Sequence, residues 1–133
     1  MAGMLYLVPT PIGNLGDISK RARETLESAD FIAAEDTRVT LKLLNHMELK
    51  KPLVSYYEHN KSFKGDKILD RILSGETCAL VSDAGSPAIS DPGEDLVKQC
   101  AAAGITVCAI PGPCAAITAL SISGQSTGRF CFE

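Results

Sequence analysis

The stretch TCALVSDAGSPAISDPG, residues 77–93, decides the fold. Its first five residues, 77–81, form a continuous apolar run rather than an alternation of apolar and polar side chains. Such a run is typical of a strand in a parallel sheet that is covered on both faces. The glycines and prolines of 82–93 then interrupt regular structure, which predicts a long loop directly after the strand.

Strands and helices are predicted to alternate on both sides of this stretch. Apolar runs predict four more strands, at 5–8, 31–34, 53–56 and 105–110. Apolar residues at helical spacing predict five helices, over 18–29, from 37 or 40 to 47, over 68–73, over 96–101 and over 114–122. This order predicts an α/β fold, an open five-stranded parallel sheet with helices on both faces.

Several details of these elements are also expected. Asp17 is expected to cap the first helix, and Leu41 and Leu44 to point inward from the second. The small residues of 114–122 would let the last helix pack closely on the sheet. Residues 129–133 look like the beginning of another strand, so residues 1–133 are expected to be an N-terminal domain. A second domain is expected after about residue 130.

The composition is that of an ordinary globular domain. No apolar run approaches the length of about 20 residues that crosses a bilayer, and the N-terminus lacks the basic segment of a signal peptide. A cytoplasmic protein without membrane association is therefore expected. The net charge of -3 gives no sign of a nucleic-acid surface. The five cysteines form no C-x-x-C pair and four are expected to be buried, and the two histidines have no metal-ligand spacing, so neither disulfides nor a metal is expected.

Three Gly/Pro-rich loops are predicted at the carboxyl ends of the strands, at 9–17, 82–93 and 111–115. Ligands of open α/β sheets bind at this edge. Gly85 allows close approach of the backbone to a ligand, and Pro87 and Pro92 keep the second loop rigid. The loops therefore predict one wall of a site for a small organic cofactor. The spacing of glycines matches neither a dinucleotide-binding fingerprint nor a P-loop.

Each of these features also has a purely structural explanation. The first loop can be a turn that needs special dihedral angles, and Ser90 or Asp91 can cap the helix after the second. Cys114 is more typical of packing than of a nucleophile, because no base follows it. The segment 35–38, with two carboxylates and a guanidinium, suits a helix cap with a surface ion pair as well as it suits a catalytic site.

Five motifs in this order resemble the tetrapyrrole methylase superfamily of S-adenosylmethionine-dependent methyltransferases. They are PTPIGNLGDIS at 9–19, AEDTR at 34–38, YEHN at 57–60, LVSDAGSPAISDPG at 80–93 and IPGPCAA at 110–116. The resemblance covers the whole chain and is nearest to the branch that methylates the 2′-hydroxyl of a cytidine ribose in 16S ribosomal RNA. It implies two α/β domains with the methyl donor in the cleft between them, and a homodimer.

The resemblance also implies which residues contact the donor. By position in the motifs, they are Pro11, Ile12, Gly13, Asp83, Ala84, Gly85, Ser86, Pro87, Pro113, Cys114 and Ala115. The family usually has Thr where Ser86 stands and Ser where Cys114 stands. Both replacements keep a small side chain, which suits recognition through the main chain, although a hydroxyl contact at position 114 is lost.

The acceptor chemistry points to a second group of residues. A ribose hydroxyl is a poor nucleophile until its proton is accepted, so a base within hydrogen-bond reach is expected. The candidates for this catalytic role are Glu35, Asp36 and His59, and the candidates for positioning ribose or phosphate are Asn14 and Arg38.

Three functions are compatible with these residues. The first is 2′-O-methylation of ribosomal RNA in the small subunit, which GNLGD and AEDTR favour. The second is C-methylation of a tetrapyrrole precursor with the same donor. The third is a non-catalytic α/β binding or assembly domain. Residues 1–133 by themselves are expected to bind the donor weakly or not at all, because half of the implied cleft is missing.

Overall fold

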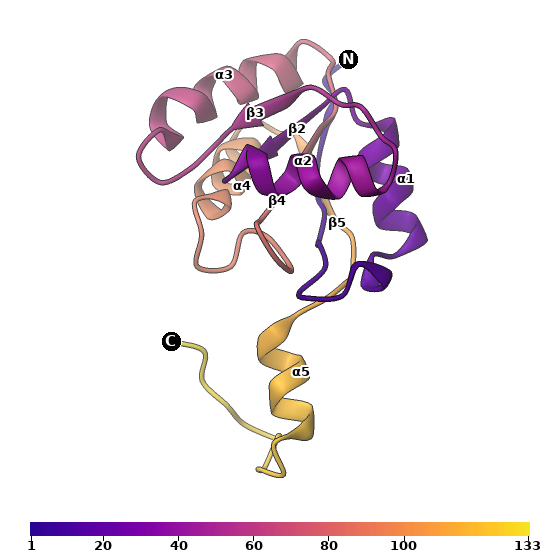
Figure 1. The fold of residues 1–133 in the computed structure, drawn as a ribbon. Helices are drawn as coiled ribbons and strands as arrows, with labels where there is room; N and C mark the ends of the chain where they lie inside the picture. Colours follow the sequence, from indigo (N-terminus) through magenta and orange to yellow (C-terminus); the bar gives the residue numbers. More distant parts are fainter.

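The computed structural model describes residues 1–133 and contains one sheet of five strands, all of them parallel. The strand order is β3-β2-β4-β1-β5 (Figure 1). The strands are β1 (Met4–Leu7), β2 (Phe31–Ala34), β3 (Leu53–Ser55), β4 (Cys78–Val81) and β5 (Thr106–Ala109). All residues of β2 and β4 are buried, which explains their continuous apolar runs. The predicted sheet is therefore confirmed.

Helices cover both faces of the sheet. They are η1 (Leu15–Asp17, a 3-10 turn), α1 (Lys20–Ser28), α2 (Thr37–His46), α3 (Lys61–Leu73), α4 (Gly93–Ala102) and α5 (Ala115–Ile122). The connections through α1 and α2 carry the chain from β1 to the edge strand β3, and those through α3 and α4 carry it back past β1 to β5. Connections between parallel strands are right-handed, so the face on which a helix lies depends on the direction in which the chain moves across the sheet. The two directions therefore place α1 and α2 on one face and α3 and α4 on the other.

Two apolar cores hold these layers together. On one face, Leu26 of α1 and Leu44 of α2 pack with Ile32 of β2. On the other face, Ile72 of α3 and Leu96 of α4 pack with the neighbouring residues of the same strands. Adjacent residues of a strand thus enter opposite cores, as the pleat of a strand requires.

Two expected details of the helices are wrong. Ser19, not Asp17, caps α1, because its hydroxyl accepts a hydrogen bond from the Ala22 amide at 3.0 Å, whereas Asp17 ends the 3-10 turn. Leu41 is 49% exposed. The inward face of α2 is instead formed by Thr40, Leu43 and Leu44, and a helix that begins at Thr37 turns Leu41 to the solvent side.

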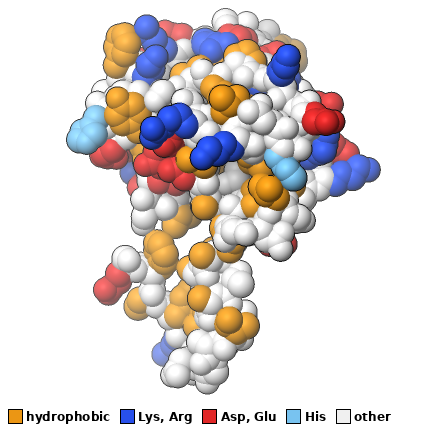
Figure 2. Space-filling view, viewed as in Figure 1, with side chains coloured by type: hydrophobic (Ala, Val, Ile, Leu, Met, Phe, Trp, Pro, Cys, Tyr) orange, Lys and Arg blue, Asp and Glu red, His pale blue; other side chains and the backbone are white.

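The end of the chain also differs from the expectation. Helix α5 does not pack on the sheet: it has no buried residue and projects from the body together with the C-terminal tail (Figure 1). Residues 129–133 form no strand. Ile122, Phe130 and Phe132 are each more than half exposed, and Figure 2 shows apolar side chains along this projection.

The cysteines are all free, and their burial is lower than expected. Cys78 and Cys100 are buried, Cys108 and Cys114 are half-buried, and Cys131 is exposed. The prediction of four buried cysteines is therefore right for two of them. None of the helices is both long and apolar enough to span a bilayer.

Candidate functional site

The first and second Gly/Pro-rich loops are joined through their backbones. Strands β1 and β4 are neighbours, so their loops leave the same edge of the sheet side by side. The Thr10 amide donates to the Gly85 carbonyl at 3.1 Å, and the Gly85 amide donates back to the Thr10 carbonyl at 2.9 Å. The hydroxyl of Thr10 also lies 3.4 Å from the Ser82 carbonyl oxygen. The two loops therefore form one structural unit.

The third loop joins this unit. The Ser86 hydroxyl donates to the Pro113 carbonyl at 3.3 Å. Gly85 has φ +79°, and a Cβ at this position would lie 3.2 Å from Ile12 Cγ2 and 3.3 Å from the Pro113 carbonyl oxygen. A side chain at Gly112 would collide with the ring of Pro9. Glycines thus permit the close contact of all three loops. The sequence predicted that the loops lie at the same edge of the sheet, but not that they touch.

The second loop is held in a strained conformation. Ala88 and Ser90 have φ values of 70° and 54°, in the left-handed region that side chains disfavour. The Asp91 carboxylate holds this path, because it accepts hydrogen bonds from the Ala88 amide at 2.9 Å and from the Gly93 amide at 2.8 Å. Strain of this kind persists where the surroundings enforce it, commonly at functional sites. A loop fixed in advance loses little entropy when a ligand binds.

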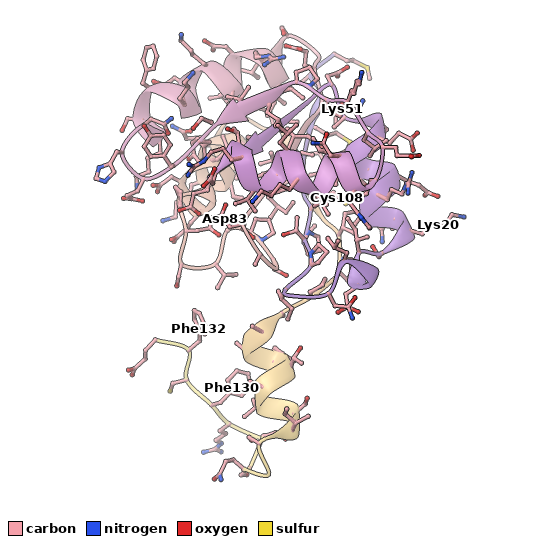
Figure 3. All side chains as sticks on the ribbon, viewed as in Figure 1. Lys20, Lys51, Asp83, Cys108, Phe130 and Phe132 are labelled. Atoms are coloured by element: carbon pink, nitrogen blue, oxygen red, sulfur yellow. The ribbon has the colours of Figure 1, made fainter.

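Carboxylates of two neighbouring strands meet beside these loops. The Asp36 amide, directly after β2, donates to Asp83 Oδ1 at 3.2 Å. Figure 3 shows Asp83 at the end of the sheet that faces α5. The pKa of Glu35 is raised above 4.5, first by partial burial and then by the charges of Asp83 and Asp91. Glu35 is therefore a better proton acceptor than an ordinary surface carboxylate.

Asp36 and Arg38 are occupied with each other. Asp36 caps α2 by accepting from the Arg38 amide at 3.0 Å, and its two oxygens accept from Arg38 Nε and Nη2 at 3.1 and 2.9 Å. These hydrogen bonds lower the pKa of Asp36. The structural explanation of the segment 35–38, a helix cap with a surface ion pair, is thus confirmed for this pair of residues. Both are less suited to the roles expected from the sequence.

His59 lies farther along the same edge. It follows the edge strand β3, and β2 separates β3 from β4. Its exposed ring makes an edge-on contact with Tyr57, at 6.4 Å between ring centroids, and no hydrogen bond joins it to the carboxylates or the three loops. Glu35 is therefore better placed than His59 to act beside the three loops.

A hollow of about 340 Å³ opens beside the first loop. It is lined by Thr10, Pro11, Gly13, Asn14, Leu15, Val39, Thr40, Lys42, Leu43, Ser82 and Asp83. The sequence indicated the residues of the first loop and Asp83, but not the residues of α2, Val39, Thr40, Lys42 and Leu43. The signal in the sequence that could have indicated these α2 residues is the apolar Val39, three positions before Lys42. In the structure Val39 is 39% exposed.

Comparisons with known proteins agree with this architecture. The family model described as tetrapyrrole (corrin/porphyrin) methylases matches residues 4–130. Over 131 residues the chain is 53% identical to ribosomal RNA small subunit methyltransferase I of Escherichia coli O157:H7, and over 130 residues it is 58% identical to that of Halalkalibacterium halodurans. Each match covers 98% of this chain but only 46% and 45% of the relative. The chain thus spans about half the length of these relatives.

Two solved structures share the fold. A conserved hypothetical protein from Aeropyrum pernix K1 superposes with a TM-score of 0.77 at 22% identity, over 98% of this chain and 46% of that one. Uroporphyrin-III-C-methyltransferase from Thermus thermophilus gives 0.69 at 23%, over 95% and 55%. Since the family model spans nearly the whole sequence, the chain belongs to the tetrapyrrole (corrin/porphyrin) methylase family.

Proposed function

We propose that the protein transfers a methyl group from S-adenosylmethionine to the 2′-hydroxyl of a cytidine ribose in small-subunit ribosomal RNA. The observation that carries this proposal is the junction of the three loops through Thr10, Gly85 and Pro113. It provides a rigid wall of backbone groups at the edge where open α/β sheets bind ligands. The relatives at 53% and 58% identity, both named as small-subunit ribosomal RNA methyltransferases, support this acceptor.

The loop residues suit a donor that is recognised through the main chain. We assign its contacts to Pro11, Ile12 and Gly13, to 83–87, and to Pro113, Cys114 and Ala115. Gly13 has positive φ and a Cβ there would meet nothing within 4 Å, so ligand atoms can approach its backbone, whereas Gly85 allows the loops themselves to come together. When bound, the donor supplies an electrophilic methyl group on its sulfonium. The task of these loops is to fix the direction from which the acceptor oxygen approaches.

We assign to the carboxylate of Glu35 the role of accepting the proton of the ribose hydroxyl. This carboxylate has a raised pKa and, unlike Asp36, has no hydrogen-bonded cation. It lies beside Asp83, which belongs to the second loop, so the base and the donor wall are adjacent. Asn14 is assigned to position the ribose, because its Oδ1 accepts from the Gly16 amide at 2.9 Å and its amide nitrogen remains available.

The decisive experiment uses the full-length protein and donor labelled in its methyl group. Label is expected in 16S RNA of small ribosomal subunits and not in a uroporphyrinogen or precorrin substrate. Label in the tetrapyrrole substrate instead would contradict the proposed acceptor and support C-methylation of a tetrapyrrole precursor, the second function considered above. Absence of donor binding in calorimetry would favour the non-catalytic domain.

The isolated residues 1–133 provide a separate test of the proposed cleft. We expect calorimetry to detect weak or no donor binding, because the chain spans about half the length of its relatives. Micromolar binding by this segment would contradict a donor site completed by a second domain. We further propose a cytoplasmic homodimer, which sedimentation analysis of the full-length protein at several concentrations would test.

A further inference from the structure

The hollow beside the first loop has walls from three elements. Asn14 and Leu15 come from the loop after β1, Val39 and Lys42 from α2, and Asp83 from the tip of β4. Its volume of about 340 Å³ falls within the range of roughly 300–1,000 Å³ that small-molecule sites occupy. It has the size of a site for one small organic unit.

The side chains around the hollow combine apolar surface with an available cation. Leu15 and Val39 are 46% and 39% exposed, so apolar surface is left open to a ligand. Lys42 is exposed and forms none of the ion pairs in the structure. Arg38 is by contrast paired with Asp36 through two side-chain hydrogen bonds. The cation that can receive a phosphate here is therefore Lys42 rather than Arg38.

The position of the hollow favours the acceptor over the donor. Of the residues assigned to the donor, only Pro11, Gly13 and Asp83 line it, so it adjoins the donor wall without coinciding with it. Methyl transfer requires this adjacency, because donor and acceptor must be held in line. Lys42 repels a cationic sulfonium and attracts a phosphate, whereas Asp83, which belongs to both the hollow and the donor wall, has the opposite preference.

We propose that this hollow receives one nucleotide of the acceptor RNA, with its base against Leu15 and Val39 and a phosphate on Lys42 Nζ. The proposal rests on the function proposed above. Because Asp83 lines the hollow and Glu35 and Asp36 lie on the neighbouring edge, these carboxylates repel RNA, and Lys42 is the contact that selects where a phosphate can sit. Leu15 and Val39 supply the apolar surface that an unstacked base requires.

The test measures steady-state methylation of small ribosomal subunits by the full-length enzyme and its Lys42→Ala and Lys42→Arg variants. We expect Lys42→Ala to raise KM for the subunits several-fold and to leave KM for the donor unchanged. It is also expected to reduce the slope of log affinity against log salt by about 1, as loss of one phosphate contact does. Lys42→Arg is expected to restore most of the affinity.

Controls separate failure of this proposal from failure of the proposed function. Lys50→Ala removes another exposed lysine, which lies before the amino end of β3 and so at the end of the strands away from the loops. This variant is expected to leave KM and the salt slope unchanged. If the unaltered enzyme does not label the subunits, the proposed function fails. If it labels them and Lys42→Ala matches it in KM and slope, or raises KM for the donor instead, the nucleotide site is wrong. Val39→Asp is expected to raise KM for the subunits as well, and an unchanged KM would overturn the base contact.

Discussion

The backbones of Thr10 and Gly85 exchange two hydrogen bonds, at 3.1 and 2.9 Å, although the residues lie in loops that follow different strands. Gly85 has φ +79°, and a Cβ there would press on Ile12 and Pro113. We expect Gly85→Ala to lower the free energy of unfolding by about 1–2 kcal/mol, the cost of a left-handed conformation with a side chain. Urea unfolding measures the change. Gly128→Ala, where the added Cβ meets nothing within 4 Å, is the matched control and is expected to change little. Equal stability of the two variants would contradict this account.

Tyr56 ties the end of β3 to the second loop. Its buried hydroxyl donates to the Pro92 carbonyl at 2.8 Å, and burial raises its pKa to about 12. Tyr56→Phe is expected to lower the free energy of unfolding at pH 7 by about 0.5–1.5 kcal/mol, the net value of one hydrogen bond. Because the folded pKa lies above the unfolded one, near 10, the stability from this hydroxyl is complete below pH 10. It is lost as the pH rises toward 12. A difference between the two proteins that persists unchanged at pH 12 would refute the assignment.

The charge of Glu35 is expected to destabilise the fold. Its pKa in the folded protein is raised above 4.5 by burial and by Asp83 and Asp91, so the protonated form is favoured. Stability from this group is therefore present at low pH and lost as the pH rises through the folded pKa. Glu35→Gln should raise the thermal midpoint at pH 7, and the gain should vanish near pH 3. Glu27→Gln on α1, outside this cluster, is the control. A gain that is the same at both pH values would exclude a charge effect.

The same substitution tests the proposed base. In the full-length enzyme, Glu35→Gln is expected to lower kcat by roughly 10²–10⁴, the usual contribution of a general base, with little change in KM for the donor. Asp36→Asn removes a charge next to it in sequence but leaves Glu35 in place. We expect Asp36→Asn to affect kcat less, since Asp36 is held by Arg38. The opposite order of the two effects would move the base to Asp36.

The projecting end of the chain is expected to bind hydrophobic dyes. Ile117, Leu120 and Phe130 line an open groove along α5, and Phe132 is 58% exposed. Figure 3 shows Phe130 and Phe132 on the tail beside α5, away from the sheet. Replacing both with Ser should reduce the fluorescence of bound anilinonaphthalene sulfonate in residues 1–133 and leave the thermal midpoint unchanged. Phe63→Ser is the control, because Phe63 is 64% exposed on α3 and lies outside the groove along α5. A lowered midpoint would mean that the tail contributes to the core.

The strands are predicted closely because each is an apolar run bounded by turn residues. The observed β2 coincides with the predicted 31–34, and β4 lies within 77–81. The helices are harder, because only their apolar positions give a signal. Helix α3 begins at Lys61, seven residues before the first apolar position used to predict it, Ile68. Helix α5 carries small and apolar residues all round, so its sequence does not tell which face, if any, meets the sheet.

The site was predictable to the level of the loops and not of their contacts. Gly85 and Pro113 were identified by residue type, since glycine and proline mark special backbone paths. The pairing of Thr10 with Gly85 depends on β1 lying beside β4, and the sequence does not give the strand order. The proposed choice of Lys42 over Arg38 as the phosphate contact depends on Asp36, which caps α2 and pairs with Arg38 but not with Lys42.

The strand order also governs when the site can be assembled during synthesis. β1 and β2 leave the ribosome early, but neither pairs with the other, because β4 lies between them. Until residues 78–81 emerge, both edges of β1 and one edge of β2 are unpaired and open to wrong partners. Insertion of this four-residue strand then completes the centre of the sheet. It also brings Gly85 next to Thr10, so the first two loops of the binding wall join when the centre of the sheet forms, and the third loop is added after β5.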